Sequence, residues 1–121
     1  MFTVPDAIVR RIYVRGSLSN TQAGFAFKLK NTLVSGNLTG AGTMAVDGRD
    51  VPPADIRFGL GDTDLGAGDV SPSSPLSLPA GIELVVRVKG VSLEHGMHEL
   101  HFPVTIKEVG PVTLSLTDEI P

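Results

Sequence analysis

Apolar and polar residues alternate along most of the chain, which is the pattern of β-strands with one buried face. The clearest stretch is 82–89, where Leu84, Val86 and Val88 alternate with mainly charged residues. No stretch keeps the 3.6-residue spacing of an amphipathic helix over a useful length. The pattern therefore predicts about seven to eight strands. They fall in the stretches 8–18, 25–30, 38–46, 56–60, 82–89, 100–106 and 112–117, with a short edge strand near 76–78.

Glycine, proline and aspartate mark the connections between these strands. Asp47-Gly48 predicts a tight hairpin turn, and Gly110-Pro111 predicts a second turn. Gly40 and Gly42 interrupt a strand pattern, which indicates a bulge or the close approach of another backbone. The stretch 61–79 is rich in Gly, Asp, Ser and Pro, and we expect a long loop there.

Each predicted strand carries three or four apolar side chains on one face, and burying each of them contributes roughly 1.5–3 kcal/mol. A single sheet would leave this face in water, so two sheets must pack together. The chain has 121 residues, which suits one domain. The expected fold is all-β: one antiparallel, immunoglobulin-like β-sandwich spanning residues 1–121.

Composition narrows the possible functions. The chain has no Cys, which excludes disulfides, thiolate metal sites and a cysteine nucleophile. Its net charge of −3 gives no basic footprint for nucleic acid. It has no Trp and one Tyr, which argues against a sugar-binding module that works by aromatic stacking. No signal peptide or membrane span is evident, so we expect a cytoplasmic protein that binds neither membrane nor nucleic acid.

Residues 94–101 contain all three histidines together with two glutamates, which suggests a metal site or an acid–base pair. In a strand beginning near Met97, His98 shares a face with Leu100, while Glu99 and His101 lie on the opposite face. One metal ion cannot bind ligands on both faces. We therefore expect no metal, cofactor or catalytic residue in this chain, and a metal site of His95, His98 and Glu99 is the weaker alternative. Ser17, Ser35 and Ser71 lack the turn that presents a nucleophilic serine.

Basic residues fall mostly on the outward faces of three predicted strands. If these strands are neighbours, they form a basic strip that docks an acidic partner; solubility and edge protection are the alternative explanation. The candidate partner-binding residues are Arg11, Tyr13, Arg15, Lys28, Lys30, Val85 and Arg87.

Three phrases, at 24–29, 44–58 and 93–100, resemble the small (β) subunit of bacterial C-glycoside deglycosidases. The resemblance covers about 24–106. It implies a β-sandwich that pairs with a larger, barrel-type subunit of carbohydrate metabolism, which would hold a divalent metal and the catalytic residues. The stretch 31–37 lacks the tyrosines and arginine of that family, so no catalytic residue is transferred.

These observations lead to two expectations. The first is a non-catalytic accessory subunit of a sugar-active, C-glycoside-cleaving complex. The alternative is a stand-alone β-sandwich module, either homo-oligomeric or ligand-binding, with no enzymatic role. A metal-dependent enzyme acting through the histidine cluster is a third and weaker interpretation.

Overall fold

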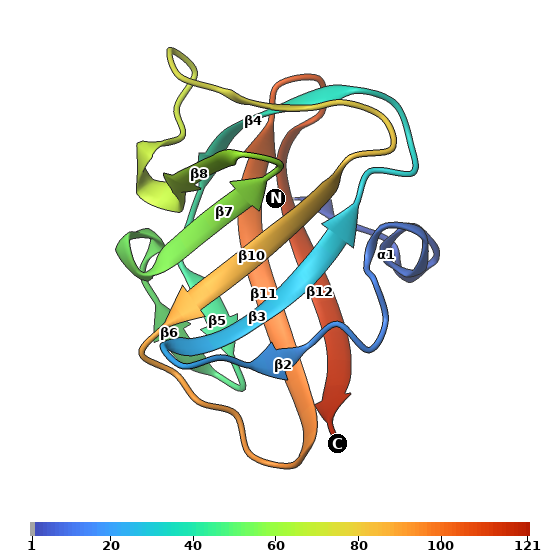
Figure 1. Cartoon of the computed structure of the whole chain (residues 1–121). Coiled ribbons are helices and arrows are strands. Elements are labelled where there is room, and N and C mark those ends of the chain that lie inside the picture. Colours follow the sequence, from blue (N-terminus) through green and yellow to red (C-terminus); the bar gives the residue numbers. More distant parts are fainter. Residues whose placement is uncertain (1) are drawn as a thin grey trace.

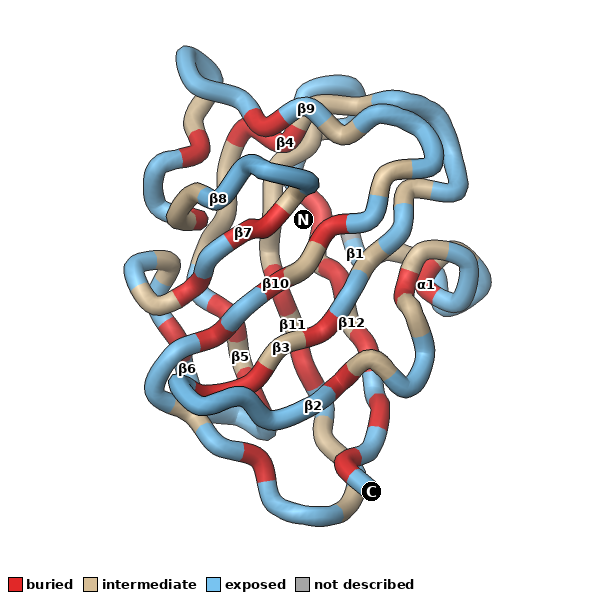
Figure 2. Tube along the Cα trace, viewed as in Figure 1, coloured by how far each residue is buried: buried red, intermediate tan, exposed pale blue. Residues whose placement is uncertain are grey.

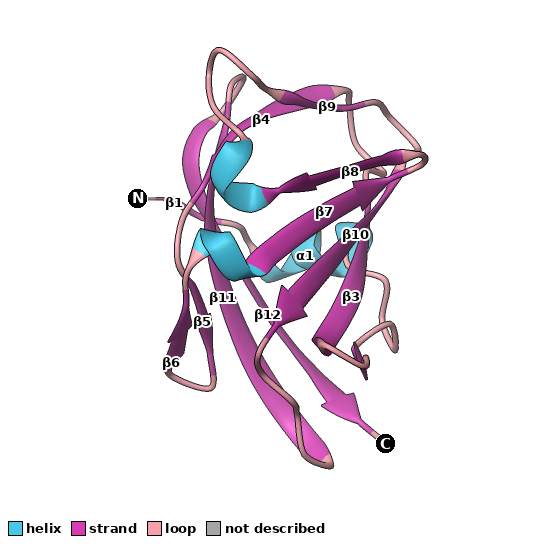
Figure 3. Cartoon of the chain, turned by 60° about the vertical axis from the view of Figure 1, so that its left-hand side comes forward, coloured by secondary structure: helices cyan, strands magenta, loops and turns pink. Residues whose placement is uncertain are grey.

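A computed structural model describes residues 2–121 and confirms the expected all-β sandwich. Two sheets face each other, and Figures 1 and 3 show them as two layers. The seven-stranded sheet has the order β1-β12-β11-β4-β9, with β5 and β6 attached through β11. Its strands are β1 (Phe2–Thr3), β4 (Gly36–Ala41), β5 (Met44–Val46), β6 (Arg49–Val51), β9 (Leu76–Leu78), β11 (Gly96–Ile106) and β12 (Gly110–Ile120).

The five-stranded sheet has the order β2-β3-β10-β7-β8 and forms the front layer of Figure 1. Its strands are β2 (Ser19–Asn20), β3 (Gly24–Lys30), β7 (Ile56–Leu60), β8 (Thr63–Gly66) and β10 (Glu83–Lys89). Three short helices complete the described chain: α1 (Asp6–Ile12), η1 (Pro53–Asp55) and η2 (Ala67–Asp69). Buried positions recur at every second residue of β10, where Leu84, Val86 and Val88 are buried as predicted.

The core lies between the two sheets. Buried residues alternate with exposed ones along β3, β10 and β7, as the red and pale segments of Figure 2 show. Phe58 of β7 meets Phe102 of β11 with their ring centroids 6.1 Å apart, so this pair joins the two layers. Phe25 and Phe27 pack beside each other on β3. The apolar faces predicted from the sequence therefore meet across one interior.

Two glycine predictions are confirmed. The Asp47-Gly48 turn joins β5 to β6, and both residues have positive φ, 51° and 84°, as a two-residue hairpin turn requires. A Cβ on Gly42 would lie 3.1 Å from Pro103 Cγ, so the neighbouring strand approaches closely there. The register between β4 and β11 shifts at Thr105/Ile106, which is the bulge expected in this region.

The strand predicted over 8–18 is wrong, because this region begins with the helix α1. Ile8 and Ile12, and likewise Val9 and Tyr13, are four residues apart and share a helical face, so a period of 3.6 fits the segment as well as a period of two. The amides of Ile8 and Val9 bond to Pro5 O and start the helix. Arg10 lies in the last turn, where a positive charge favours the helix dipole.

The stretch 61–79 has more structure than the expected loop. The predicted edge strand near 76–78 is present as β9, which pairs with β4. The sequence did not predict β8, which folds back on β7 through a turn at Gly61, where φ is 59°. This β7–β8 hairpin forms one wall of a surface hollow. Among residues 2–121, no helix has the length and apolar character needed to cross a membrane.

Candidate functional site

The outer face of the five-stranded sheet is the most distinctive surface of the molecule. Phe27, Val86 and Phe58 point from β3, β10 and β7 into the core, so the alternate residues of these strands face outward. The strand register aligns one outward row across the sheet, from Asp64 through Gly59 and Val85 to Lys28. Residues distant in the sequence therefore meet on one face.

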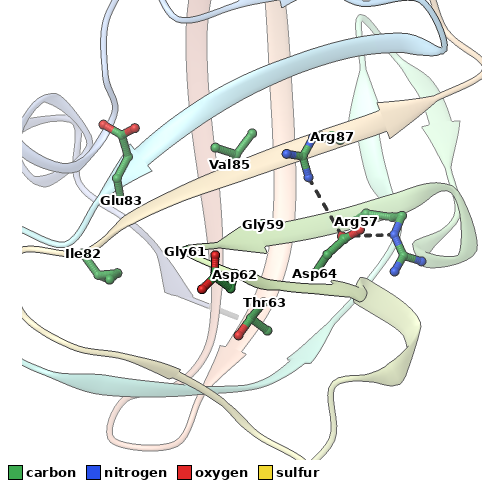
Figure 4. A pocket seen from close by; sticks show the side chains of 10 residues that line it. All are labelled: Arg57, Gly59, Gly61, Asp62, Thr63, Asp64, Ile82, Glu83, Val85 and Arg87. Carbon is green, nitrogen blue, oxygen red and sulfur yellow. Dashed lines mark hydrogen bonds and ion pairs between the residues drawn. The ribbon is translucent and has the colours of Figure 1, made fainter.

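A hollow of about 610 Å³ opens on this face (Figure 4). Gly59 contributes no side chain to it, and its register partner Val85 on β10 adds an apolar side chain. A Cβ on Gly59 would lie 2.8 Å from Arg87 Nη1, which means that the guanidinium of Arg87 lies against the glycine. A larger residue at this position would push the Arg87 guanidinium aside.

Two arginines share one carboxylate beside the hollow, as Figure 4 shows. Arg57 Nε lies 3.2 Å and Arg87 Nη1 lies 3.9 Å from Asp64 Oδ1. All three side chains are slightly more than half exposed. Exposed ion pairs contribute roughly 0–1 kcal/mol, so Asp64 holds the two guanidinium groups only weakly. Both remain able to bind an incoming anion.

The face is basic although the whole chain is acidic. Some of its positive charge is paired within the face, because Lys28 Nζ lies 3.7 Å from Glu83 Oε1. Three carboxylates line the hollow, namely Asp62, Asp64 and Glu83. Five of the ten Lys and Arg residues of the chain lie on the outward side of β3, β7 and β10: Lys28, Lys30, Arg57, Arg87 and Lys89. A positive face on a chain of net charge −3 favours an acidic partner.

The structure brings together four residues of the predicted basic strip. Lys28 and Lys30 on β3 lie next to Val85 and Arg87 on β10. The strip predicted from the sequence lacks Arg57, which belongs to the same face. Its signal was present, because Arg57 alternates with the buried residues Ile56 and Phe58.

Tyr13, Arg11 and Arg15 lie elsewhere. Tyr13 is buried, and its hydroxyl donates a hydrogen bond of 2.6 Å to Asp118 Oδ2. Burial, helped by this hydrogen bond, raises the pKa of Tyr13 well above its ordinary value. Arg11 is exposed on α1, and Arg15 lines a second hollow beside β11 and β12. The prediction that one exposed strip contains all seven residues is wrong, because residues 6–12 form a helix that directs Tyr13 inward.

The histidine cluster is split among different partners. His98 bonds to Asp47, and His95 Nδ1 lies 2.8 Å from Pro121 O. Glu99 lies on the other face with His101, as expected, with 2.7 Å between Glu99 Oε1 and His101 Nε2. The alternative metal site of His95, His98 and Glu99 is therefore not assembled. Across residues 2–121, no group of three or more His, Cys, Asp or Glu side chains is placed to hold a metal ion.

A family model for the N-terminal domain of hydroxymethylglutaryl-CoA reductase matches residues 8–121. The chain belongs to this family. The match covers every strand except β1 and includes the whole basic face. None of the curated proteins matches the chain.

Membership of the hydroxymethylglutaryl-CoA reductase N-terminal domain family overturns the resemblance to the deglycosidase small subunit. The phrases behind that resemblance coincide with common local structures. Residues 24–29 form an ordinary half-buried strand, and 44–58 contain a hairpin turn followed by strand β7. Many unrelated sandwiches need the same residue types at such positions.

Proposed function

We propose that this domain is a non-catalytic accessory domain that docks a larger catalytic partner through the outer face of the five-stranded sheet. The basic character of that face on an acidic chain is the observation that carries the proposal. Electrostatic complementarity of this kind steers association and selects the partner. We expect the partner to present Asp and Glu side chains to Lys28, Arg57 and Arg87.

The family supports a choice of partner. The family is named for the N-terminal domain of a reductase, so the partner we propose is the catalytic portion of a hydroxymethylglutaryl-CoA reductase, either in the same protein or as a separate chain. The barrel-type, sugar-active partner with its divalent metal followed from the deglycosidase resemblance and loses its basis with it. We propose that the reaction, with any cofactor it needs, belongs to the partner.

The composition supports a cytoplasmic site of action for this pair. The chain has no Cys and so no disulfide, as is usual for proteins of the reducing cytoplasm. We propose that the docked pair works there, and fractionation of cells that express both proteins tests this location.

The test is direct binding between the chain and the reductase catalytic portion from the same organism. The face variant carries Lys28→Glu and Arg87→Glu, and we expect it to weaken binding at least about tenfold in isothermal titration. The matched control carries Arg49→Glu and Lys107→Glu. Both of these residues are exposed and lie off the basic face. The control reverses two positive charges, as the face variant does, so the two variants have the same net charge.

Two results would overturn the proposal. One is the absence of a complex between the unmodified chain and the catalytic portion. The other is equal affinity of the face variant and the control for the catalytic portion, which would show that the partner does not bind this face. Thermal unfolding of each variant verifies that the fold is retained.

The size of the hollow favours a second candidate, a stand-alone ligand-binding module. Its volume of about 610 Å³ lies in the range of small-molecule sites. A ligand that binds only the folded state raises the unfolding temperature. A thermal-shift screen of the isolated chain with carboxylates and phosphates tests this candidate. A rise that is lost in Arg87→Ala would favour it over docking.

A further inference from the structure

A second hollow, of about 400 Å³, lies between α1 and the outer face of strands β11 and β12. It belongs to the seven-stranded sheet, so it is separate from the basic face. Its polar lining includes Glu99 and His101 on β11, Ser115 and Thr117 on β12, and Asp6, Arg10 and Arg15 from the N-terminal segment. Such a convergence of nucleophilic, titratable and cationic groups is what an active site requires.

Three of these side chains form a continuous line of hydrogen bonds. His101 and Ser115 are direct partners in the antiparallel pairing of β11 with β12, and Ser115 Oγ lies 2.8 Å from His101 Nδ1. On the other side of the ring, Nε2 lies 2.7 Å from Glu99 Oε1. Glu99 and His101 are two residues apart on one strand face, so the strand itself sets this geometry.

The acceptors and donors fix where the protons lie. An ionised carboxylate only accepts, so Nε2 must carry the proton that it donates to Glu99. Nδ1 of the neutral ring then has a free lone pair and accepts the hydroxyl proton of Ser115. The nucleophile's proton therefore already points at a base, and that base is oriented by a carboxylate. This is the arrangement of a serine nucleophile, a histidine base and an acidic residue.

We propose that Ser115 is a nucleophile that accepts an acyl group from small carboxylic esters, with His101 as its base and Glu99 as a positioning residue. The side chain of His101 is 42% exposed and that of Glu99 is 65% exposed, so a small substrate can reach the line. This acyl transfer is separate from the partner's reaction, in which the domain supplies no catalytic residue, because it uses a different sheet from the docking face and needs no partner.

The chemistry balances without a cofactor. Ser115 Oγ bonds to the ester carbonyl carbon while its proton moves to His101 Nδ1. The bond to the alcohol then breaks, and the departing oxygen takes that proton. Water repeats the sequence on the acyl-serine, giving the carboxylic acid and restoring Ser115. Arg10 and Arg15 line the hollow and offer positive charge to the carbonyl oxygen as it becomes negative.

The test uses p-nitrophenyl acetate with the whole chain. We expect release of p-nitrophenol, together with a mass increase of one acetyl group that peptide mapping places on Ser115. Ser115→Ala removes both signals. His101→Gln keeps the serine but removes the base, and it lowers the acylation rate by about 100-fold or more.

The matched control is Ser77→Ala, which removes an exposed strand serine of the same sheet and leaves the rate unchanged. Circular dichroism and the unfolding midpoint verify that each variant is folded. Equal rates for the unmodified chain and Ser115→Ala would overturn the proposal, and so would an acetyl group found on another residue.

Glu99→Gln separates a positioning role from a structural one. The amide can either donate to or accept from Nε2, so the ring is no longer held in one tautomer. We expect the ring-nitrogen NMR signals of His101 to show the proton on Nε2 in the unmodified chain and on both nitrogens in Glu99→Gln. The acylation rate falls in the same variant. Unchanged nitrogen signals would contradict the role assigned to Glu99.

Discussion

His98 Nδ1 lies 2.6 Å from Asp47 Oδ2, and this bond ties the β5–β6 turn to the start of β11. His98 Nε2 lies 2.7 Å from the carbonyl oxygen of Glu94. Both acceptors lack protons, so both ring nitrogens donate and the ring is the imidazolium cation. The backbone amide of Glu99 also donates to Asp47, at 2.8 Å. One charged pair thus joins three segments of the chain.

The pair makes the stability of the fold depend on pH. The hydrogen bond to Asp47, followed by the bond to Glu94, raises the pKa of His98 above its ordinary value of 6.5. The bond from His98 lowers the pKa of Asp47 below its ordinary value of 3.8. The contribution of His98 is therefore full below pH 6.5 and is lost as pH rises through the raised pKa. The contribution of Asp47 is full above pH 3.8 and is lost as pH falls through the lowered pKa.

We predict that His98→Gln lowers the free energy of unfolding by about 1 kcal/mol at pH 5, because Asp47 is 44% exposed and solvent screens the pair. The difference between the two proteins shrinks toward pH 9, as the unmodified His98 loses its proton on passing the raised pKa. Urea unfolding at the two pH values measures it. The control is His95→Gln, which leaves the Asp47 pair intact. An equal difference at pH 5 and pH 9 would contradict the charged state of His98.

Tyr13 and Asp118 form a second link, between α1 and the end of β12, and this one is buried. Asp118 accepts from the Tyr13 hydroxyl at 2.6 Å and from the Gly16 amide at 2.8 Å. Burial opposes the ionisation of Asp118, but these hydrogen bonds outweigh it and lower its pKa. We predict that Tyr13→Phe destabilises the fold by about 1.5–3 kcal/mol at pH 7, as loss of a hydrogen bond to a charged group does.

The pH dependence of this variant gives an independent measurement. A lowered pKa stabilises the fold above the ordinary value of 3.8 and loses that effect as pH falls. Because Tyr13→Phe removes part of the cause, its stability should fall less steeply in acid than that of the unmodified chain. The ring still packs on Phe27, 6.3 Å away between centroids, so packing is conserved. A parallel fall for both proteins would contradict the assignment.

The sequence predicted the sandwich well because alternation survives wherever one face of a strand is buried. Strand β10 shows this, with Leu84, Val86 and Val88 buried as expected. The helix α1 was missed because seven residues are too few to separate a period of two from one of 3.6. Strand β8 was missed because its sequence, Thr63–Gly66, has no apolar alternation and lies at a sheet edge.

The two hollows were harder to predict, since each depends on register between strands. The predicted turn at Gly110-Pro111 would place His101 opposite Ile120, whereas the actual turn at 107–109 pairs His101 with Ser115, so the sequence signal for this contact was in the wrong register. The link between Tyr13 and Asp118 had none, because 105 residues separate the partners and no local pattern connects them. The Gly59 hollow likewise needs three strands to be placed first.

Gly24 begins β3 at a point where the neighbouring backbone leaves no space. A Cβ there would lie 2.0 Å from Val88 O, and the obstacle is backbone that cannot rotate away. We predict that Gly24→Ala destabilises the fold by more than about 3 kcal/mol, measured by thermal or urea unfolding. Gly68→Ala is the control, because its Cβ would lie 3.9 Å from Pro53 Cβ, and its expected change is under about 1 kcal/mol. Equal effects would contradict the steric argument.

Asp64 competes with any acidic partner for Arg57 and Arg87. Its removal should therefore change the affinity for the partner while leaving the stability of the fold nearly unchanged. We predict that Asp64→Asn changes the free energy of unfolding by no more than about 0.5 kcal/mol, because both ion pairs are exposed. The same variant should bind the reductase catalytic portion at least about twofold more tightly at low salt, since both guanidinium groups become free for partner carboxylates.

This gain should disappear at high salt, where exposed charges are screened. Asp50→Asn is the matched control, because Asp50 is exposed on β6 in the other sheet and removes the same charge. Isothermal titration at two salt concentrations measures both variants. Equal tightening by Asp64→Asn and Asp50→Asn would mean that net charge alone controls the affinity and that the arginines of the hollow do not contact the partner.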